Sequence, residues 1–194
     1  MSLEEIGWLA SGADLRSALD RRRAELERDR RLVDERLRAL DISLAADTDV
    51  VVRPVGVEQV AVMQVGAAPD EAFYELESYV RDVARRAHRP PGAIPDQREI
   101  FVPVAGPFPE TERIRYRRLP AVRIASVIHR GSYRGVAESR HALLSWVAAA
   151  NLTITGPMRT LYLQFGAEPE LRLPAGYVVE RSDDFVTELQ LPIA

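Results

Sequence analysis

The sequence of 194 residues contains no cysteine and no lysine, and it has no long apolar run. Without cysteine the chain has no disulfide framework, no zinc finger and no thiol nucleophile. No stretch approaches the roughly 20 apolar residues of a membrane-spanning helix. The N-terminal segment carries acidic residues without a basic cluster, so no signal peptide is expected. We therefore expect a cytoplasmic protein with no membrane partner.

All 26 basic residues are arginine, and with 29 acidic residues the net charge is −3. This balance argues against a protein that binds nucleic acid through its overall field. The arginine-rich stretch at 21–31 has Glu25, Glu27 and Asp29 interleaved with it. Ion pairs three or four residues apart on a solvated helix are the simpler interpretation.

The apolar residues between 15 and 44 recur at spacings of three, four or seven, which predicts one long helix. Asp14 is the expected N-cap, and a short helical segment is expected over residues 1–13. A long helix with one narrow apolar stripe needs a partner, because isolated helices are marginally stable. We expect residues 14–46 to be a coiled-coil-type dimerisation helix that pairs with a second copy of the chain.

The remainder of the chain repeats itself. Val57–Gly66 resembles Ala121–Gly131, and each of these expected strands is followed by an amphipathic helix, at about 71–88 and about 135–150. Further strands are expected at 98–102, 159–163, 113–118 and 186–191. Two copies of a β-α-β-β unit cannot each bury a sheet face alone, so they should pack together.

The expected fold class is therefore α+β, with a duplicated β-α-β-β unit, an antiparallel sheet and a central groove. This domain spans 49–194, and its repeats cover about 49–104 and 113–194.

Strand alternation gives the groove a chemical character. Leu189 and Leu191 share the face expected to meet the helices, and Glu188 lies on the opposite face. The same alternation separates Leu161 and Leu163 from Tyr162, and Ile100 from Phe101. One face of the sheet is thus expected to be aliphatic, whereas the other brings Phe101, Tyr162 and Glu188 together. Aromatic rings around a carboxylate suit a flat, apolar cation, although a solvent-facing role for Glu188 stays open.

At this point a family becomes apparent. Residues 119–133, Trp146 and the terminal Thr187–Ile193 together resemble the GyrI-like effector-binding domains. The long helix resembles the dimerisation helix of MerR-family transcription regulators of the BmrR type, and residues 2–14 look like the last helix of a MerR DNA-binding domain. The winged helix-turn-helix expected before Ser2 is absent from the sequence, so DNA would be bound only through a domain that this chain lacks.

The resemblance implies a paired, SH2-like fold in which a buried groove glutamate selects amphipathic, cationic and aromatic small molecules, as in multidrug binding. By this resemblance the glutamate is Glu188, and Tyr133, Trp146 and Tyr162 match aromatic positions of the groove. Together with Phe101 from strand alternation, these are the expected ligand-binding residues. The leading hypothesis is the small-molecule sensing and dimerisation part of a MerR-type regulator.

Two other functions stay open. Some proteins that resemble GyrI-like domains hydrolyse strained electrophilic compounds, for which Glu188 with Tyr133 or Tyr162 would assist water. An interaction module that inhibits a protein is the second alternative. The three histidines show no metal spacing, and no cofactor motif is present, so we expect no enzyme activity, no cofactor and no metal. The segment Gly166–Phe185 is expected to cover the groove or to close the fold.

Overall fold

The computed structural model describes residues 16, 18–30, 49–66, 69–81, 83–86, 89–167 and 169–194. The chain forms two compact units, Met1–Asp41 and Ile42–Ala194. In the first unit, Arg16 and residues 18–30 are helical, so the structure describes a short part of the helix predicted over 14–46 and not a long coiled-coil helix. The rest of that prediction, and the short helix predicted over 1–13, lie outside the described residues. In the described ranges no helix is long and apolar enough to cross a membrane.

The charged residues of this helical segment pair along its surface. Arg22 bonds Glu25 at 3.0 Å, and Arg23 bonds Glu27 at 3.0 Å. These pairs confirm the prediction that acidic residues neutralise the arginine-rich stretch locally. The leucines described in this unit are exposed, Leu19 at 60% and Leu26 at 52%.

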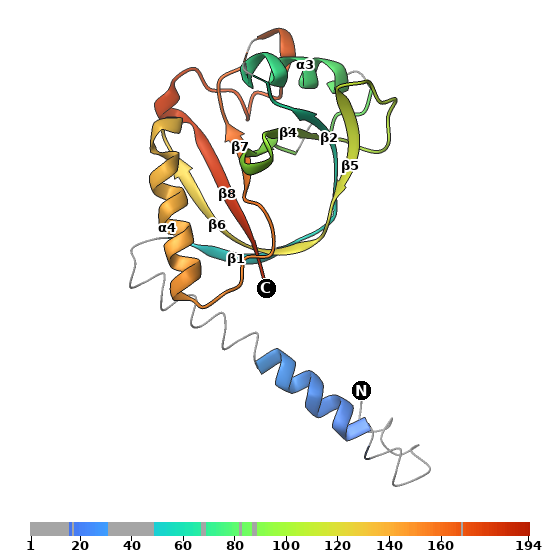
Figure 1. The fold of residues 1–194 in the computed structure, drawn as a ribbon, viewed down its shortest axis with the longest axis vertical. Coiled ribbons are helices and arrows are strands. Elements are labelled where there is room, and N and C mark those ends of the chain that lie inside the picture. Colours follow the sequence, from blue (N-terminus) through green and yellow to red (C-terminus); the bar gives the residue numbers. More distant parts are fainter. Residues whose placement is uncertain are drawn as a thin grey trace. The chain divides into compact units, whose positions relative to one another are not determined.

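The described residues of the second unit form one eight-stranded sheet and two α-helices, and their arrangement is drawn in Figure 1. Every strand pair in the sheet is antiparallel, which confirms the predicted sheet type. The elements in chain order are β1 (Val51–Val55), β2 (Glu58–Gln64), α3 (Pro69–Arg81), β3 (Gly92–Ile94), β4 (Glu99–Pro103), β5 (Ile114–Leu119), β6 (Val122–Arg130), α4 (Val136–Ala149), β7 (Arg159–Gln164) and β8 (Val186–Ile193).

The strand order is β1-β6-β8-β7-β3-β4-β2-β5, and it reads as two equivalent halves. Read from either edge, β1 corresponds to β5, β6 to β2, β8 to β4 and β7 to β3. The halves join where β3 pairs with β7. The edge strands are exchanged, because β1 pairs with β6 of the second copy and β5 pairs with β2 of the first. Each copy therefore completes the sheet of the other.

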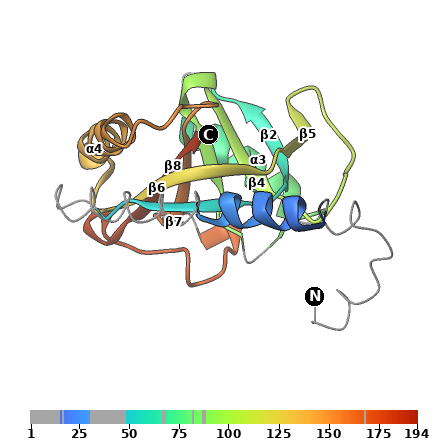
Figure 2. The same ribbon diagram turned by 90° about the horizontal axis from the view of Figure 1, so that it is seen from below.

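This order forces the sheet to curl. Strands β1 and β2 lie six positions apart, which is about 29 Å in a flat sheet. Only residues 56 and 57 connect them, and three Cα steps span at most about 11 Å. Residues 120 and 121 impose the same limit on β5 and β6. The sheet consequently bends into an open barrel, and α4 and β5 lie at opposite sides of it (Figure 2).

Both helices lie on the outer face of the curled sheet (Figure 1). Helix α3 buries Ala72, Leu76 and Val80 against β2, β4 and β5. Helix α4 buries Leu143, Trp146 and Val147 and packs against β6 and β8. The inner face has its own apolar cluster, which consists of Val60, Val62, Ile94, Phe101 and Leu119, with Leu161 packed against it. The barrel is therefore apolar on both faces.

Three predictions from the sequence need correction. The helix predicted over 71–88 is shorter, because α3 ends at Arg81 and Arg85 forms a bridge with Val104. Each half begins with an additional strand, β1 before β2 and β5 before β6, so each half is β-β-α-β-β. Strand β3, directly after Pro90-Pro91, was not among the strands that we predicted. The counterpart of 159–163 is accordingly β3 and not 98–102.

Candidate functional site

A cavity of about 540 Å³ lies on the outer face of the sheet, beside the seam between the two halves. We call it the aromatic pocket. Its ceiling and walls come from α3, from the turn before α4, from β7 and from the chain between β7 and β8. The lining residues are Phe73, Tyr74, Ile100, Tyr133, Tyr162, Phe165, Gly166, Ala167, Leu171 and Phe185.

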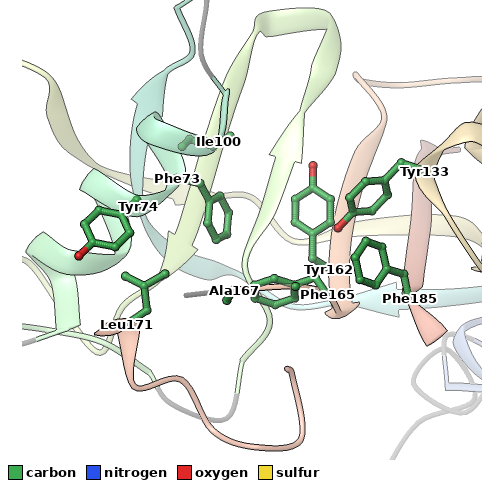
Figure 3. Close-up of a pocket in the computed structure, with 10 residues that line it drawn as sticks. Phe73, Tyr74, Ile100, Tyr133, Tyr162, Phe165, Ala167, Leu171 and Phe185 are labelled. Atoms are coloured by element: carbon green, nitrogen blue, oxygen red, sulfur yellow. The ribbon is translucent and has the colours of Figure 1, made fainter. Parts of the chain in front are cut away.

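The rings of this pocket form a connected cluster (Figure 3). The centroids of Tyr133 and Phe185 are 5.0 Å apart, and those of Tyr133 and Tyr162 are 5.8 Å apart. Phe73 meets Tyr162 edge-on at 6.0 Å and Phe165 at 5.9 Å. Such pairs expose both ring faces and ring edges, so the pocket offers stacking surfaces and the negative potential of ring faces.

The turn after β6 positions Tyr133. Gly131 has a φ of 104°, which side chains rarely allow, and its amide donates to the Phe185 carbonyl at 2.9 Å. His129 lies behind the turn, with its Nε2 2.9 Å from the Ser132 carbonyl oxygen. These bonds fix the Gly131–Tyr133 turn between β6 and the start of β8. Tyr133 nevertheless stays 46% exposed, at the pocket mouth.

The segment between β7 and β8 closes one side of the pocket. The amide of Phe165 donates to the Tyr177 carbonyl at 2.8 Å, and Leu171 is buried beside the pocket. Arg81 of α3 donates to the Glu170 carbonyl at 2.9 Å and ties this segment to the first half. Within Gly166–Phe185, which we expected to cover the groove or to close the fold, Phe185 lines the aromatic pocket and Tyr177 does not.

A second cavity, of about 240 Å³, lies on the inner face of the sheet, and we call it the barrel cavity. Its lining is Arg53, Val55, Gly56, Glu58, Arg89, Pro90, Phe101, Pro103, Leu119, Arg159, Leu161, Leu163, Glu188 and Gln190. Glu188 is 6% exposed, and both of its oxygens are engaged. Arg53 bonds Oε1 at 2.8 Å and Gln190 bonds Oε2 at 3.0 Å.

The structure divides the predicted ligand residues between these two cavities. Tyr133 and Tyr162 line the aromatic pocket, whereas Phe101 and Glu188 line the barrel cavity. The prediction that Tyr162 shares a face with Glu188 is wrong. Leu161 is the direct partner of Glu188 in the sheet, so Leu161 faces inward with it and Tyr162 faces the helices.

Trp146 lines neither of the two cavities as the structure describes them. It is 2% exposed and belongs to the buried face of α4, together with Leu143 and Val147. Its position in α4 matches Tyr79 in α3, which is only partly buried. The two helices thus use an aromatic residue at the same place for packing.

The sequence interpretation missed Phe73, Tyr74 and Arg159. Phe73 and Tyr74 directly follow Ala72, which belongs to the buried apolar stripe of α3. Two adjacent aromatic residues beside such a stripe were the signal in the sequence that could have indicated this part of the pocket. Arg159 is the first residue of β7 and is 8% exposed. Burial, and then the nearby Arg117, lower the pKa of Arg159. A buried arginine at a strand start leaves no such signal in the sequence.

The described residues contain no group of three or more side chains suited to hold a metal ion. The residues described as lining the aromatic pocket include no aspartate, no glutamate and no histidine. The pocket therefore offers binding surfaces and hydroxyl groups, and the charged chemistry lies in the barrel cavity.

A family model described as a GyrI-like small molecule binding domain matches residues 95–194. No protein of curated function matches the sequence significantly. Among solved structures, the chain is similar to EcmrR in its cryo-EM complex with DNA, with a TM-score of 0.72, 17% identity, and coverage of 100% of this chain and 77% of that one.

The crystal structure of the EcmrR C-terminal domain is also similar, with a TM-score of 0.61, 14% identity, and coverage of 76% and 98%. A hydrolase from Listeria innocua gives a TM-score of 0.50, 12% identity, and coverage of 75% and 91%. Identities this low establish a shared fold and leave the chemistry to the side chains.

Proposed function

The chain belongs to the family of GyrI-like small molecule binding domains, and from this membership we propose that its aromatic pocket binds an amphipathic, aromatic cation. The observation that carries the proposal is the connected ring cluster around a cavity of about 540 Å³. That volume is in the range of small-molecule sites, and such sites are mostly apolar with few polar groups.

The rings supply the preference for a positive charge. Ring faces of Tyr133, Tyr162 and Phe73 border the cavity, and each attracts a cation within about 6 Å of its centroid. No arginine is among the described residues that line the pocket, so a cation meets no like charge there. A neutral ligand of the same shape gains the stacking and loses the charge attraction.

We propose further that the chain is the sensing and dimerisation part of a MerR-type transcription regulator. The fold is shared with EcmrR, whose structure was determined in complex with DNA. The exposed Leu19 and Leu26 give the helical segment an apolar stripe that a second copy would bury. DNA would be contacted by a winged helix-turn-helix outside this sequence, and the ligand would shift the state of the dimer.

Glu188 has a different role in this proposal from the one inferred by resemblance. It lies on the inner face with Phe101, and Arg53 and Gln190 already occupy its oxygens. We therefore assign the ligand contacts to Tyr133 and Tyr162, and we assign Trp146 to packing. Hydrolysis is not proposed, because the general base it requires is not among the described residues of the aromatic pocket.

Binding of 10-methylacridinium and of acridine at pH 8 tests this proposal, because the first is a permanent cation and the second is its neutral analogue. Fluorescence titration should show tighter binding of the cation to the full chain. Tyr162→Ala should weaken binding of the cation about tenfold, since it removes one stacking face and its charge attraction.

Tyr116→Ala is the matched control. Tyr116 is also a partly buried tyrosine packed against the α3 core, but it lies outside the aromatic pocket. It should leave the affinity for 10-methylacridinium unchanged. Equal binding of the two ligands would reject the preference for cations, and equal losses in the two variants would reject the pocket.

A further inference from the structure

Arg159 is a buried charge without a partner in the described part of the chain. Its side chain lines the barrel cavity, and the residue is 8% exposed. No hydrogen-bond acceptor or carboxylate among the described residues pairs with its guanidinium. An isolated buried charge is strongly unfavourable, and buried arginines are normally paired.

The other charged residues that line this cavity already have ion-pair partners. Arg53 pairs with Glu188. Glu58 pairs with both Arg86 and Arg89. Arg117, whose positive charge lowers the pKa of Arg159, pairs with Glu99. The lining residues include three arginines and two glutamates, which leaves one positive charge in excess and calls for one negative charge from outside.

Apolar residues also line the cavity, and they favour an anion with an apolar body. Phe101, Leu161, Leu163 and Leu119 line the cavity together with the charged residues. Its volume of about 240 Å³ equals about eight water molecules at ~30 Å³ each, which is the size class of a small aromatic acid. Arg53 and Arg89, which also line the cavity, have side chains that are 43% and 55% exposed, so solvent reaches part of its lining.

We propose that the barrel cavity is a second ligand site, which binds a small carboxylate with an apolar body and uses the guanidinium of Arg159 as its counter-charge. The planar guanidinium presents two parallel N–H donors, and a carboxylate accepts both. Phe101 and Leu161 then contact the apolar body. The site lies on the inner face of the sheet, whereas the aromatic pocket lies on the outer face, and the two differ in the charge they prefer.

Benzoate is the probe, and benzamide is its neutral control. Thermal unfolding of the full chain at low ionic strength should show a rise in Tm of about 3–6 °C at a tenfold excess of benzoate over its Kd. Benzamide, and sodium chloride at equal ionic strength, should not produce this rise. Isothermal titration should give one benzoate per chain.

Two variants identify the site. Arg159→Met keeps an apolar stem without the charge, so benzoate affinity should fall about ten- to a hundredfold. Without benzoate this variant should unfold at a higher temperature than the unsubstituted chain, because an unpaired buried charge has been removed. Arg118→Met removes an exposed arginine of β5 that lies outside the cavity, and it should change neither value.

Three results would overturn the proposal. One is the absence of benzoate binding to the unsubstituted chain, and another is unchanged benzoate binding in Arg159→Met. The third is an equal Tm rise with chloride, which would indicate screening of charge only. These outcomes are independent of 10-methylacridinium binding, so the proposals for the barrel cavity and for the aromatic pocket are tested separately. If Arg159→Met fails to fold, the comparison of benzoate with benzamide on the unsubstituted chain still decides.

Discussion

Among the described residues, Arg85 and Arg159 are both largely buried, but they differ in their hydrogen-bond partners. The Arg85 side chain is 7% exposed and bonds both oxygens of Glu77, from Nε at 2.9 Å and from Nη2 at 3.1 Å. It also donates to the carbonyls of Arg86 and Arg89. Arg159 has no comparable acceptor in the described ranges. Burial alone thus does not distinguish a structural arginine from a candidate binding residue. The hydrogen-bond partners of each guanidinium group distinguish them.

Removing one partner of the Glu77–Arg85 pair should destabilise the fold. Glu77→Gln leaves the guanidinium buried without its counter-charge, and the free energy of unfolding should fall by about 3 kcal/mol. The double variant Glu77→Leu with Arg85→Met should lose less than the sum of its single changes, because neither charge remains unpaired. Urea unfolding measures all of these values. Additive losses would show that the pair is not coupled.

The same pair predicts a dependence on pH. Burial raises the pKa of Glu77, and the charge and hydrogen bonds of Arg85 oppose this rise. In Arg85→Met that opposition is gone, so the pKa of Glu77 in the folded state stays above its ordinary value of 4.5 and Glu77 keeps its proton to higher pH. Stability is then present at low pH and is lost as pH rises through the raised pKa. The stability gap to the unsubstituted chain should be wider at pH 8 than at pH 5, and a constant gap would contradict this explanation.

At the scale of elements, the seam between β3 and β7 joins the two halves. Gly92 makes this contact possible, because a methyl group on it would lie 2.5 Å from the Phe101 ring and 2.9 Å from the Leu161 side chain. It would also overlap the Thr160 carbonyl oxygen. The close approach of two backbones at this point depends on the absence of a side chain.

Gly92→Ala should therefore separate the halves at their seam. The free energy of unfolding should fall by about 2–3 kcal/mol, since carbonyl oxygen and packed ring have little room to move. Gly66→Ala is the control, because nothing lies within 4 Å of a methyl group there. Chemical denaturation compares the two variants. A Gly92→Ala loss as small as that of Gly66→Ala would show that the seam can relax.

Much of this arrangement could be predicted from the sequence, and the failures have a physical cause. The similarity of Val57–Gly66 to Ala121–Gly131 indicates the equivalent strands β2 and β6, and α4 was expected within one residue of its ends. Strand alternation correctly separated Leu189 from Glu188. Strand alternation assigned the wrong faces in β7. It separates the residues of a strand into two sets, but in a curled sheet with apolar residues on both faces it does not show which set faces inward.

The site was only partly predictable for the same reason. Tyr133 and Tyr162 were expected to line a ligand site, and they line one pocket, but Glu188 lies on the other face. The partner that neutralises Glu188 is Arg53, which is 135 positions away in the chain. Arg53 reaches it because the edge strands are exchanged between the halves. A pairing that depends on strand exchange cannot be read from local spacing.

At the scale of the whole molecule, the chain combines a helical unit with a binding unit that has its own core and complete sheet. The described part of the helical unit contributes exposed leucines, and the binding unit contributes both cavities. Assembly and ligand binding are therefore expected to reside in different units of the chain.

Deletion of residues 1–46 should separate these two properties. The shortened chain should fold and bind 10-methylacridinium with unchanged affinity, because all residues described as lining the aromatic pocket are retained. Light scattering should report a dimer for the full chain and a monomer for the shortened one. A dimeric shortened chain would place the interface on the sheet unit.

The location of 10-methylacridinium in a crystal of the complex tests the central claim most directly. The account predicts that the flat cation lies on the outer face of the sheet, in contact with Phe73, Tyr133 and Tyr162. Density for the cation in the barrel cavity, beside Glu188 with its bond to Arg53 broken, would contradict the account.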